Sequence, residues 1–199
     1  FFSAILLFDN NQPAGQWGSS GANAVERSGA AIKGPADAKV TIVEFLDPAC
    51  GTCAQFYGLT NLLLKEYEGK VRLMVRYAPL HPGSDRVVEM LEAAHLQDRF
   101  WPALELLFST QNRWVVNHQS QPQRARSILN SIPLDQAKMD SDLVSSAVTG
   151  AVMQDVNDAN ALGVRATPEF FVNGKSLPSF GYEQLERLVR EAVEEHYPQ

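Results

Sequence analysis

The sequence has only two cysteines among its 199 residues, and both lie in one short motif, Cys50-Gly51-Thr52-Cys53. A small protein held together by disulfides carries several cysteine pairs at wider spacings, so that class is excluded. A chain of this length buries enough apolar surface to fold without disulfides or a structural metal. The two cysteines are therefore candidates for activity rather than for a covalent framework.

The sequence also lacks an excess of positive charge. It has 17 Lys and Arg residues against 23 Asp and Glu residues, which gives a net charge of −6. A protein that binds nucleic acid needs basic side chains to neutralise phosphates, so nucleic acid is not expected as a partner. The 45% hydrophobic and 20% charged residues are typical of a globular protein rather than a disordered one.

No apolar run in the sequence is long enough to cross a bilayer, which needs about 20 residues. Residues 1–8 are mostly apolar, and a stretch rich in Gly, Ser, Asn and Gln follows them from Asn10 to Gly34. We interpret residues 1–8 as the end of a membrane anchor or signal segment, with the polar stretch as a tether. The alternative is a short element that packs on the body of the protein.

The remaining pattern is α/β. Apolar and β-branched runs predict strands, and apolar residues at spacings of three and four predict helices. A long, almost purely helical block lies between two strand regions, and Asn173-Gly174 signals a hairpin turn between the last two strands. The predicted strands are 39–46, 70–77, 169–172 and 176–180; the predicted helices are 50–68, a helix from Ser84, 100–108, 124–130, 143–159 and 182–196; residues 112–123 are predicted to be a loop.

The cysteine pair follows a strand and opens a helix. A helix N-terminus offers unpaired N–H groups and partial positive charge, so the pKa of Cys50 should fall below the free value of about 8.5. Cys53 lies one turn deeper, where it can close a disulfide with Cys50 or resolve a mixed disulfide. The alternative is half of a zinc site. That site needs two more ligands, and the four histidines are scattered without ligand spacing.

Two motifs together carry a resemblance. Phe45-Leu-Asp-Pro-Ala-Cys-Gly-Thr-Cys53 resembles the active-site turn of the thioredoxin superfamily, and Gly163-Val-Arg-Ala-Thr-Pro-Glu-Phe-Phe-Val-Asn-Gly174 is similar to its cis-proline loop. The helical block between them is similar to that of the DsbA-like branch. The resemblance implies a thioredoxin-like α/β fold with an inserted all-helical subdomain. It divides the chain into an N-terminal segment and linker (1–35), a thioredoxin-like domain (36–82 and 163–199) and a helical insertion (83–162).

The resemblance also assigns a role to Thr167 and Pro168. It implies a cis peptide bond between them, which would turn the backbone of Thr167 toward the cysteine pair. The exposed N–H and C=O groups could then pair with an extended substrate segment. The alternative is a trans proline that only begins a strand.

Glu44 is an acidic residue within an otherwise apolar strand. On strand alternation it shares a face with Ile42 and Leu46, where a carboxylate is costly to bury. In the family an acid at this spacing lies beneath the cysteines, which implies that Glu44 is a proton acceptor for Cys53 with a raised pKa. The alternative is a solvated glutamate on an edge strand. Arg72 and Arg76 on the second strand could pair with Glu44 or lie in solvent.

The sequence as a whole predicts a thiol–disulfide oxidoreductase. Its substrates would be cysteine-containing proteins, it would need no cofactor or metal, and a membrane redox partner would recycle it in the bacterial periplasm or at the extracytoplasmic face of the membrane. Introduction of disulfides is the first expectation. Isomerase or reductase activity is the second. The resemblance implies it, because the family's strong oxidases carry a charged His between the cysteines and usually Val before the proline, whereas this chain has the uncharged Gly51-Thr52 and Thr167. A glutathione-dependent enzyme and a copper-binding or chaperone module are the alternatives from other classes.

Overall fold

A computed structural model describes residues 25–198 of the chain. The segment 1–8, interpreted above as an anchor, lies outside the described residues. The elements follow in the order β1 (Ala31–Lys33), β2 (Val40–Leu46), α2 (Gly51–Glu66), β3 (Val71–Tyr77), α3 (Ser84–His95), α4 (Phe100–Ser109), α5 (Gln111–Trp114), β4 (Val115–Val116), β5 (Gln119–Ser120), α6 (Pro122–Leu129), α7 (Gln136–Leu143), α8 (Ser146–Ala161), β6 (Glu169–Val172), β7 (Lys175–Ser176) and α9 (Tyr182–His196).

The central sheet has the strand order β1-β3-β2-β6-β7. The strands β2 and β3 run parallel with Glu44 opposite Val75, whereas β6 is antiparallel to β2 and β1 is antiparallel to β3. Every residue of β2 is buried, as expected for a strand that is covered on both faces. The predicted thioredoxin-like α/β fold is confirmed.

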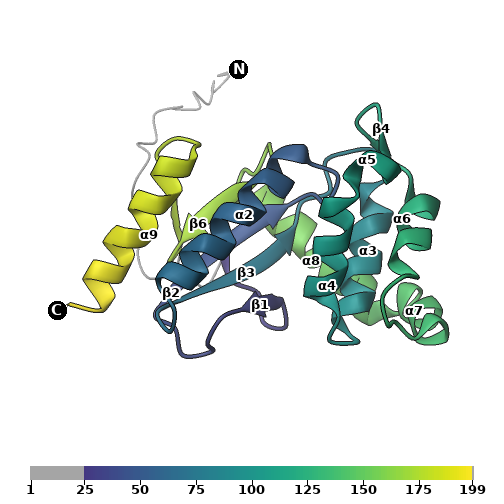
Figure 1. Cartoon of the computed structure of the whole chain (residues 1–199), viewed down its shortest axis with the longest axis horizontal. Coiled ribbons are helices and arrows are strands. Elements are labelled where there is room, and N and C mark those ends of the chain that lie inside the picture. The colour runs from purple at the N-terminus through teal and green to yellow at the C-terminus, as the bar shows by residue number, and fades with distance from the viewer. Residues whose placement is uncertain (1–24, 199) are drawn as a thin grey trace, which may run out of the picture.

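Alternation along β2 gives the sheet two different faces. Ile42 and Leu46 pack into the larger core with α2 and α9, whereas Val43 and Phe45 pack into a smaller core that includes Ala159 of α8. In Figure 1 the helices α3 to α7 gather at one end of the molecule, α9 lies at the other end, and the sheet lies between them. Glu44 therefore faces the side of the sheet that α2 covers, the side that carries the cysteines.

The helical block between β3 and β6 extends the larger core, which also contains Ile42 and Leu46 of β2. Leu91, Leu104, Leu107 and Trp114 are fully buried, and the Trp114 indole N–H donates a hydrogen bond to the Leu107 carbonyl at 2.9 Å. The predicted loop 112–123 is wrong in part, because it holds the end of α5 and the short β4–β5 hairpin. The exact residues at which the helical insertion begins and ends, 83 and 162, stay predictions.

Three further elements differ from the sequence prediction. Strand β1 and helix α7 are additional, since β1 is only three residues long and α7 buries only Met139. Strand β7 is shorter than predicted and ends before Pro178, which cannot donate a ladder hydrogen bond. The Asn173-Gly174 turn is present, with φ values of 47° and 78° that suit a tight hairpin.

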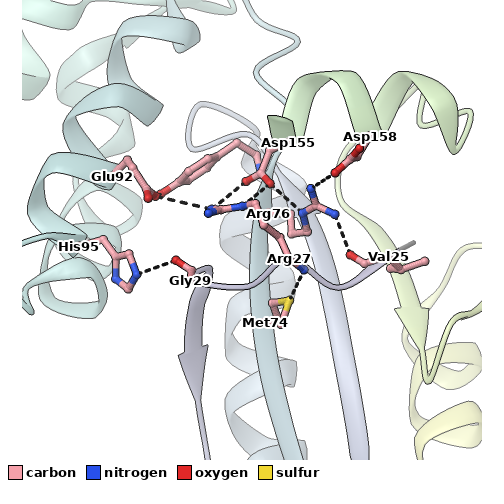
Figure 2. Close-up of polar contacts among 10 residues, drawn as sticks. Val25, Arg27, Gly29, Met74, Arg76, Glu92, His95, Asp155 and Asp158 are labelled. Atoms are coloured by element: carbon pink, nitrogen blue, oxygen red, sulfur yellow. Dashed lines mark hydrogen bonds and ion pairs between the residues drawn. The ribbon is translucent and has the colours of Figure 1, made fainter. Parts of the chain in front are cut away.

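A buried ionic cluster lies on the face of the sheet opposite to α2 (Figure 2). It binds the chain segment before β1 and the helical block to the sheet. The Asp155 carboxylate on α8 accepts hydrogen bonds from the Nε atoms of Arg27 and Arg76, both at 2.7 Å. It also accepts from the backbone N–H of Tyr77 at 3.1 Å, while the Tyr77 hydroxyl donates to Glu92 of α3 at 2.8 Å. These side chains are almost completely buried, so each charge depends on its partners.

Neither arginine of β3 pairs with Glu44, and Arg76 is not solvated. Arg76 and Arg72 lie opposite Phe45 and Thr41 of β2, so their side chains leave the sheet on the face away from Glu44. Arg76 is fully buried and pairs with Asp155 and Asp158. Arg72 binds the Thr41 hydroxyl and pairs with Glu26.

We predict that Asp155→Asn lowers the free energy of unfolding by about 3–5 kcal/mol, because it leaves the two buried guanidinium groups without their shared counter-charge. Urea denaturation measures this change. The matched control is Asp85→Asn, which removes an exposed carboxylate 3.8 Å from Arg86 and should change the stability by less than about 0.5 kcal/mol. Equal effects of the two substitutions would contradict the structural role given to the cluster.

Candidate active site

The structure places Cys50 and Cys53 at the start of α2, both as free thiols. Cys50 is the N-cap residue with extended backbone angles, and its N–H donates to the Asp47 carbonyl at 3.0 Å. Cys50 is 7% exposed, whereas Cys53 is completely buried. Only the first sulfur can therefore meet a reactant from outside.

The pKa of Cys50 is lowered to about 5. The largest cause is a hydrogen bond from the Cys53 thiol, which is opposed by burial. Further hydrogen bonds from the Thr167 side chain and from the backbone N–H groups of Cys53 and Thr52 also lower it. The N-terminus of the helix thus supplies donors for a thiolate, as its position in the sequence predicts.

The pKa of Cys53 is shifted in the opposite direction. Burial raises its pKa well above the usual value, and the hydrogen bond to Cys50 and the charges of Glu44 and Cys50 raise it further. A buried thiol that stays protonated suits a sulfur that reacts only after the first one. The two cysteines are therefore matched as an attacking and a resolving sulfur.

Glu44 lies on β2, on the face that α2 covers, and only 1% of its surface is exposed. Its Oε1 atom is buried without a hydrogen-bond partner among residues 25–198. Burial raises the pKa of Glu44 to about 8, with a further contribution from the charge of Cys50. A carboxyl that titrates near neutral pH beside a buried thiol can exchange a proton with it.

Thr167 and Pro168 lie against the first cysteine. The Cys50 Sγ atom is 3.2 Å from the Thr167 carbonyl oxygen, to which Cys50 donates only while its thiol is protonated. The Thr167–Pro168 peptide bond is cis, and Pro168 is buried while Thr167 is partly exposed. The sequence-predicted residues Cys50, Cys53, Glu44, Thr167 and Pro168 therefore come together at one place.

Asp47 belongs to this site, although the sequence analysis missed it. Its fully buried carboxylate accepts hydrogen bonds from the Ala49 N–H at 2.8 Å, the Ser84 hydroxyl at 2.7 Å, and both the backbone N–H and Nδ1 of His81 at 2.7 and 2.8 Å. It thereby joins the turn before Cys50 to the start of α3. An acid directly before Pro in this turn was the available signal, because Asp side chains hydrogen-bond backbone N–H groups two residues on.

Gln111 of α5 also holds the turn that carries Cys50. Its side-chain Nε2 atom donates to the carbonyl oxygens of Pro48 at 2.8 Å and Cys50 at 3.0 Å. The helical block therefore contacts the active-site turn at two points. Asp47 of the turn accepts from the start of α3, and Gln111 of α5 donates to the turn. Sequence offers no signal for this contact, because Gln111 lies far along the chain in a polar stretch.

Between residues 25 and 198, no group of three or more His, Cys, Asp or Glu side chains is arranged to hold a metal ion. Of the four histidines, His81 and His118 stack with their ring centroids 6.5 Å apart. Within the same range, no helix combines the length and apolar character needed to cross a bilayer.

The model of a thioredoxin family matches residues 27–191 of the chain. The chain belongs to this thioredoxin family. The match spans both sequence motifs and the helical block between them.

Solved structures show which thioredoxin-family proteins this chain resembles. A thioredoxin-like oxidoreductase from Silicibacter pomeroyi is 25% identical, with a TM-score of 0.74 over 86% of this chain and 97% of that one. BdbD from Bacillus subtilis is 23% identical, with a TM-score of 0.70 over 83% and 94% of the two chains. The α-DsbA1 protein of Wolbachia pipientis has a TM-score of 0.68 at 20% identity, over 88% and 94%. The expected resemblance to the DsbA-like branch is confirmed for the fold.

The curated relatives that match the chain are named as Na(+)/H(+) antiporters. A protein named Na(+)/H(+) antiporter NhaA from Herminiimonas arsenicoxydans is 35% identical over 146 residues, which cover 73% of this chain and 22% of that protein. A second antiporter of this name, from Salinispora tropica, is 33% identical and is likewise covered over 22% of its length. This thioredoxin-family chain therefore spans about a fifth of the length of the curated relatives that it matches.

We predict that Glu44→Gln changes the pH dependence of stability of the reduced protein. The folded pKa of about 8 lies above the unfolded value of about 4.3, so the folded state keeps a proton that the unfolded chain has lost. The stability that the parent derives from this bound proton is fully present below about pH 4.3. Between that pH and about pH 8 the free energy of unfolding declines by about 1.4 kcal/mol per pH unit. Urea denaturation at several pH values should show Glu44→Gln gaining stability relative to the parent across this window.

The matched control is Glu68→Gln, which alters an exposed glutamate just beyond α2. Its stability should follow that of the parent at every pH. A constant difference between Glu44→Gln and the parent from pH 4.5 to pH 8 would mean that Glu44 is ionised throughout, against the burial described above.

Proposed function

We propose that the protein is a thiol–disulfide oxidoreductase that exchanges disulfides with cysteine-containing proteins at Cys50 and Cys53. The observation that carries the proposal is the contrast between the two sulfurs. Cys50 keeps 7% of its surface exposed and has a pKa lowered to about 5, while Cys53 is completely buried with a raised pKa. A zinc or copper site would need both sulfurs as thiolate ligands, which the raised pKa of Cys53 disfavours.

The exchange begins with the disulfide form of the pair. A substrate thiolate attacks Cys50 Sγ, a substrate–Cys50 disulfide forms, and the Cys50–Cys53 bond breaks. A second substrate thiolate then attacks the substrate sulfur of this mixed disulfide, which forms the substrate disulfide and releases the Cys50 thiolate. The substrate loses two electrons and the cysteine pair gains them.

Glu44 is proposed to move the proton that this exchange requires. When the Cys50–Cys53 bond breaks, Cys53 leaves as a buried thiolate and takes a proton from the Glu44 carboxyl. In the reverse step the Glu44 carboxylate accepts the proton of the Cys53 thiol, which can then attack the mixed disulfide at Cys50. A pKa of about 8 lets Glu44 act in both directions near neutral pH.

Thr167 and Pro168 are proposed to dock the substrate. The Thr167 carbonyl lies 3.2 Å from Cys50 Sγ, so a substrate segment bonded to the backbone of Thr167 would bring its own sulfur beside the reactive one. An extended segment can bind in this way whatever its side chains are. The buried Pro168 fixes the backbone beneath the segment.

The proposed direction is the introduction of disulfides. A thiolate stabilised at Cys50 stabilises the reduced form of the pair, and a pair whose reduced form is stable is a good oxidant. A separate redox partner at the membrane must then remove the two electrons after each turnover. No cofactor enters the exchange.

We place this reaction at the extracytoplasmic face of the membrane, in an oxidising compartment. The likeness to BdbD and to the Wolbachia DsbA structures supports this location. The antiporter name of the curated relatives supports nearness to a membrane. Attachment through residues 1–8 belongs to the same proposal.

The first test replaces each sulfur in turn. Cys50→Ser should abolish exchange with a two-cysteine peptide, because no accessible thiolate remains. Cys53→Ser should accumulate a mixed disulfide with a peptide disulfide, because nothing resolves it. Non-reducing mass analysis and a peptide oxidation assay measure both results.

Gly58→Ala is the matched control on the same helix, since an added Cβ there meets open space. It should exchange disulfides at the parental rate. Retained turnover in Cys50→Ser would overturn the proposed function.

A further inference from the structure

The Asp47 carboxylate lies fully buried three residues before Cys50, and hydrogen-bond donors surround both of its oxygens. Oδ1 accepts from the Ala49 N–H at 2.8 Å and from the Ser84 hydroxyl at 2.7 Å. Oδ2 accepts from the backbone N–H of His81 at 2.7 Å and from its Nδ1 atom at 2.8 Å. An ionised carboxylate only accepts hydrogen bonds, so four donors on two oxygens suit this form.

The same residue closes the turn that carries Cys50. The Cys50 N–H donates to the Asp47 carbonyl at 3.0 Å, while the Ala49 N–H donates to the Asp47 side chain. These two bonds fix the direction in which the chain enters α2, with Cys50 as its N-cap residue. At that position the backbone N–H groups of Thr52 and Cys53 donate to the Cys50 sulfur.

The supports of the Asp47 carboxylate continue into the helical block. Ser84 is the first residue of α3 and is fully buried. Because its hydroxyl proton goes to Asp47, Ser84 accepts from the Ser120 hydroxyl at 2.8 Å. The Ser120 N–H donates to the Pro82 carbonyl at 2.9 Å, which joins the β4–β5 hairpin to the same connection. The position of Asp47 therefore depends on α3 and on this hairpin.

The two redox forms of the cysteine pair need this anchor to different degrees. In the disulfide form a covalent bond holds Cys50 to Cys53. In the reduced form only non-covalent contacts hold the Cys50 thiolate against its hydrogen-bond donors, and such charge-assisted bonds depend on alignment. Loss of the anchor therefore destabilises the reduced form more than the oxidised form, which shifts the equilibrium toward the disulfide.

We propose that Asp47 is a positioning residue that sets the reduction potential of the cysteine pair, with His81 and Ser84 as its supports. It keeps the backbone donors aligned on the Cys50 sulfur and so stabilises the reduced form. The inference rests on the proposed function, because it concerns the control of the same pair. Through Asp47 the packing of the helical block tunes the oxidising strength of the two sulfurs.

A direct effect of the Asp47 charge would have the opposite sign. A carboxylate repels a nearby thiolate, which raises the pKa of the thiol and destabilises the reduced form. If charge were the whole effect, its removal would lower the pKa of Cys50 and make the pair more oxidising. Loss of the anchor raises this pKa and makes the pair more reducing, so the direction of the change separates the two effects.

The first test is Asp47→Asn, which keeps the side-chain shape and replaces one oxygen with an NH₂ group. Whichever way the amide turns, this group meets the backbone N–H of Ala49 or of His81. The protein is equilibrated at pH 7 with glutathione, two molecules of which give two electrons to the disulfide and become glutathione disulfide. We expect the equilibrium constant for reduction to fall about tenfold, which is about 30 mV toward a more reducing potential.

The thiolate titration of Cys50 is the second measurement on Asp47→Asn. A tenfold change in the stability of the thiolate corresponds to one pKa unit. The midpoint of the thiolate absorbance should therefore rise by about one pH unit relative to the parent.

A second set of variants changes His81, whose side chain is 24% exposed and lies at the edge of the site. His81→Ala removes one donor to Asp47 and should lower the equilibrium constant by about twofold to fivefold. His81→Asn offers an amide N–H in place of Nδ1 and should restore the parental value. His118→Asn is the control, because the His118 ring stacks on His81 without bonding to Asp47, and Asn tolerates its φ of 59°.

Urea denaturation of both redox forms separates positioning from a purely structural role. Positioning requires the reduced form of Asp47→Asn to lose more stability than its oxidised form. Equal losses with an unchanged equilibrium constant, a shift toward a more oxidising pair, or no recovery in His81→Asn would overturn the proposal. Failure of the proposed function is a separate result, because the parent would then leave the two-cysteine peptide unoxidised whatever its equilibrium with glutathione.

Discussion

The burial of Cys53 directly beneath Cys50 is the constraint on which the chemistry of this protein depends. A buried thiol keeps its proton and donates it in a hydrogen bond to the neighbouring sulfur, which is the largest cause of the low Cys50 pKa. The same dry environment raises the pKa of Glu44 to about 8. One packing contact, that of α2 on β2, therefore prepares the thiolate, the resolving thiol and the proton acceptor together.

Much of the fold could be predicted because strand and helix periodicities are strong in this sequence. The pattern around β2 and β3 located both strands, and the alternation of β2 placed Glu44 on the face of Ile42 and Leu46. The same alternation could have placed Arg76 on the opposite face, where the structure pairs it with Asp155. That partner lies on a distant helix, so no local pattern could have named it. Short elements such as β1 also escaped, because three residues carry too little periodicity.

The site was predictable where its residues stand in one motif, and not where distant segments meet. Cys50 and Cys53 are marked by their spacing, and Thr167 and Pro168 by the second motif. Asp47 stands inside the first motif, but its partners His81 and Ser84 come from the next connection along the chain. Gln111 acts through hydrogen bonds that only the packing of the helical block on the active-site turn creates.

The ionisation of Cys50 is the most direct test of this account. The absorbance of the thiolate near 240 nm is recorded against pH in the reduced protein, with Cys50→Ser as the blank. The account predicts a transition centred near pH 5 that is absent from Cys50→Ser, while Cys53 remains protonated far beyond neutral pH. A single transition near the free cysteine value of about 8.5 would contradict it, because the hydrogen bonds to Cys50 would then not hold a thiolate.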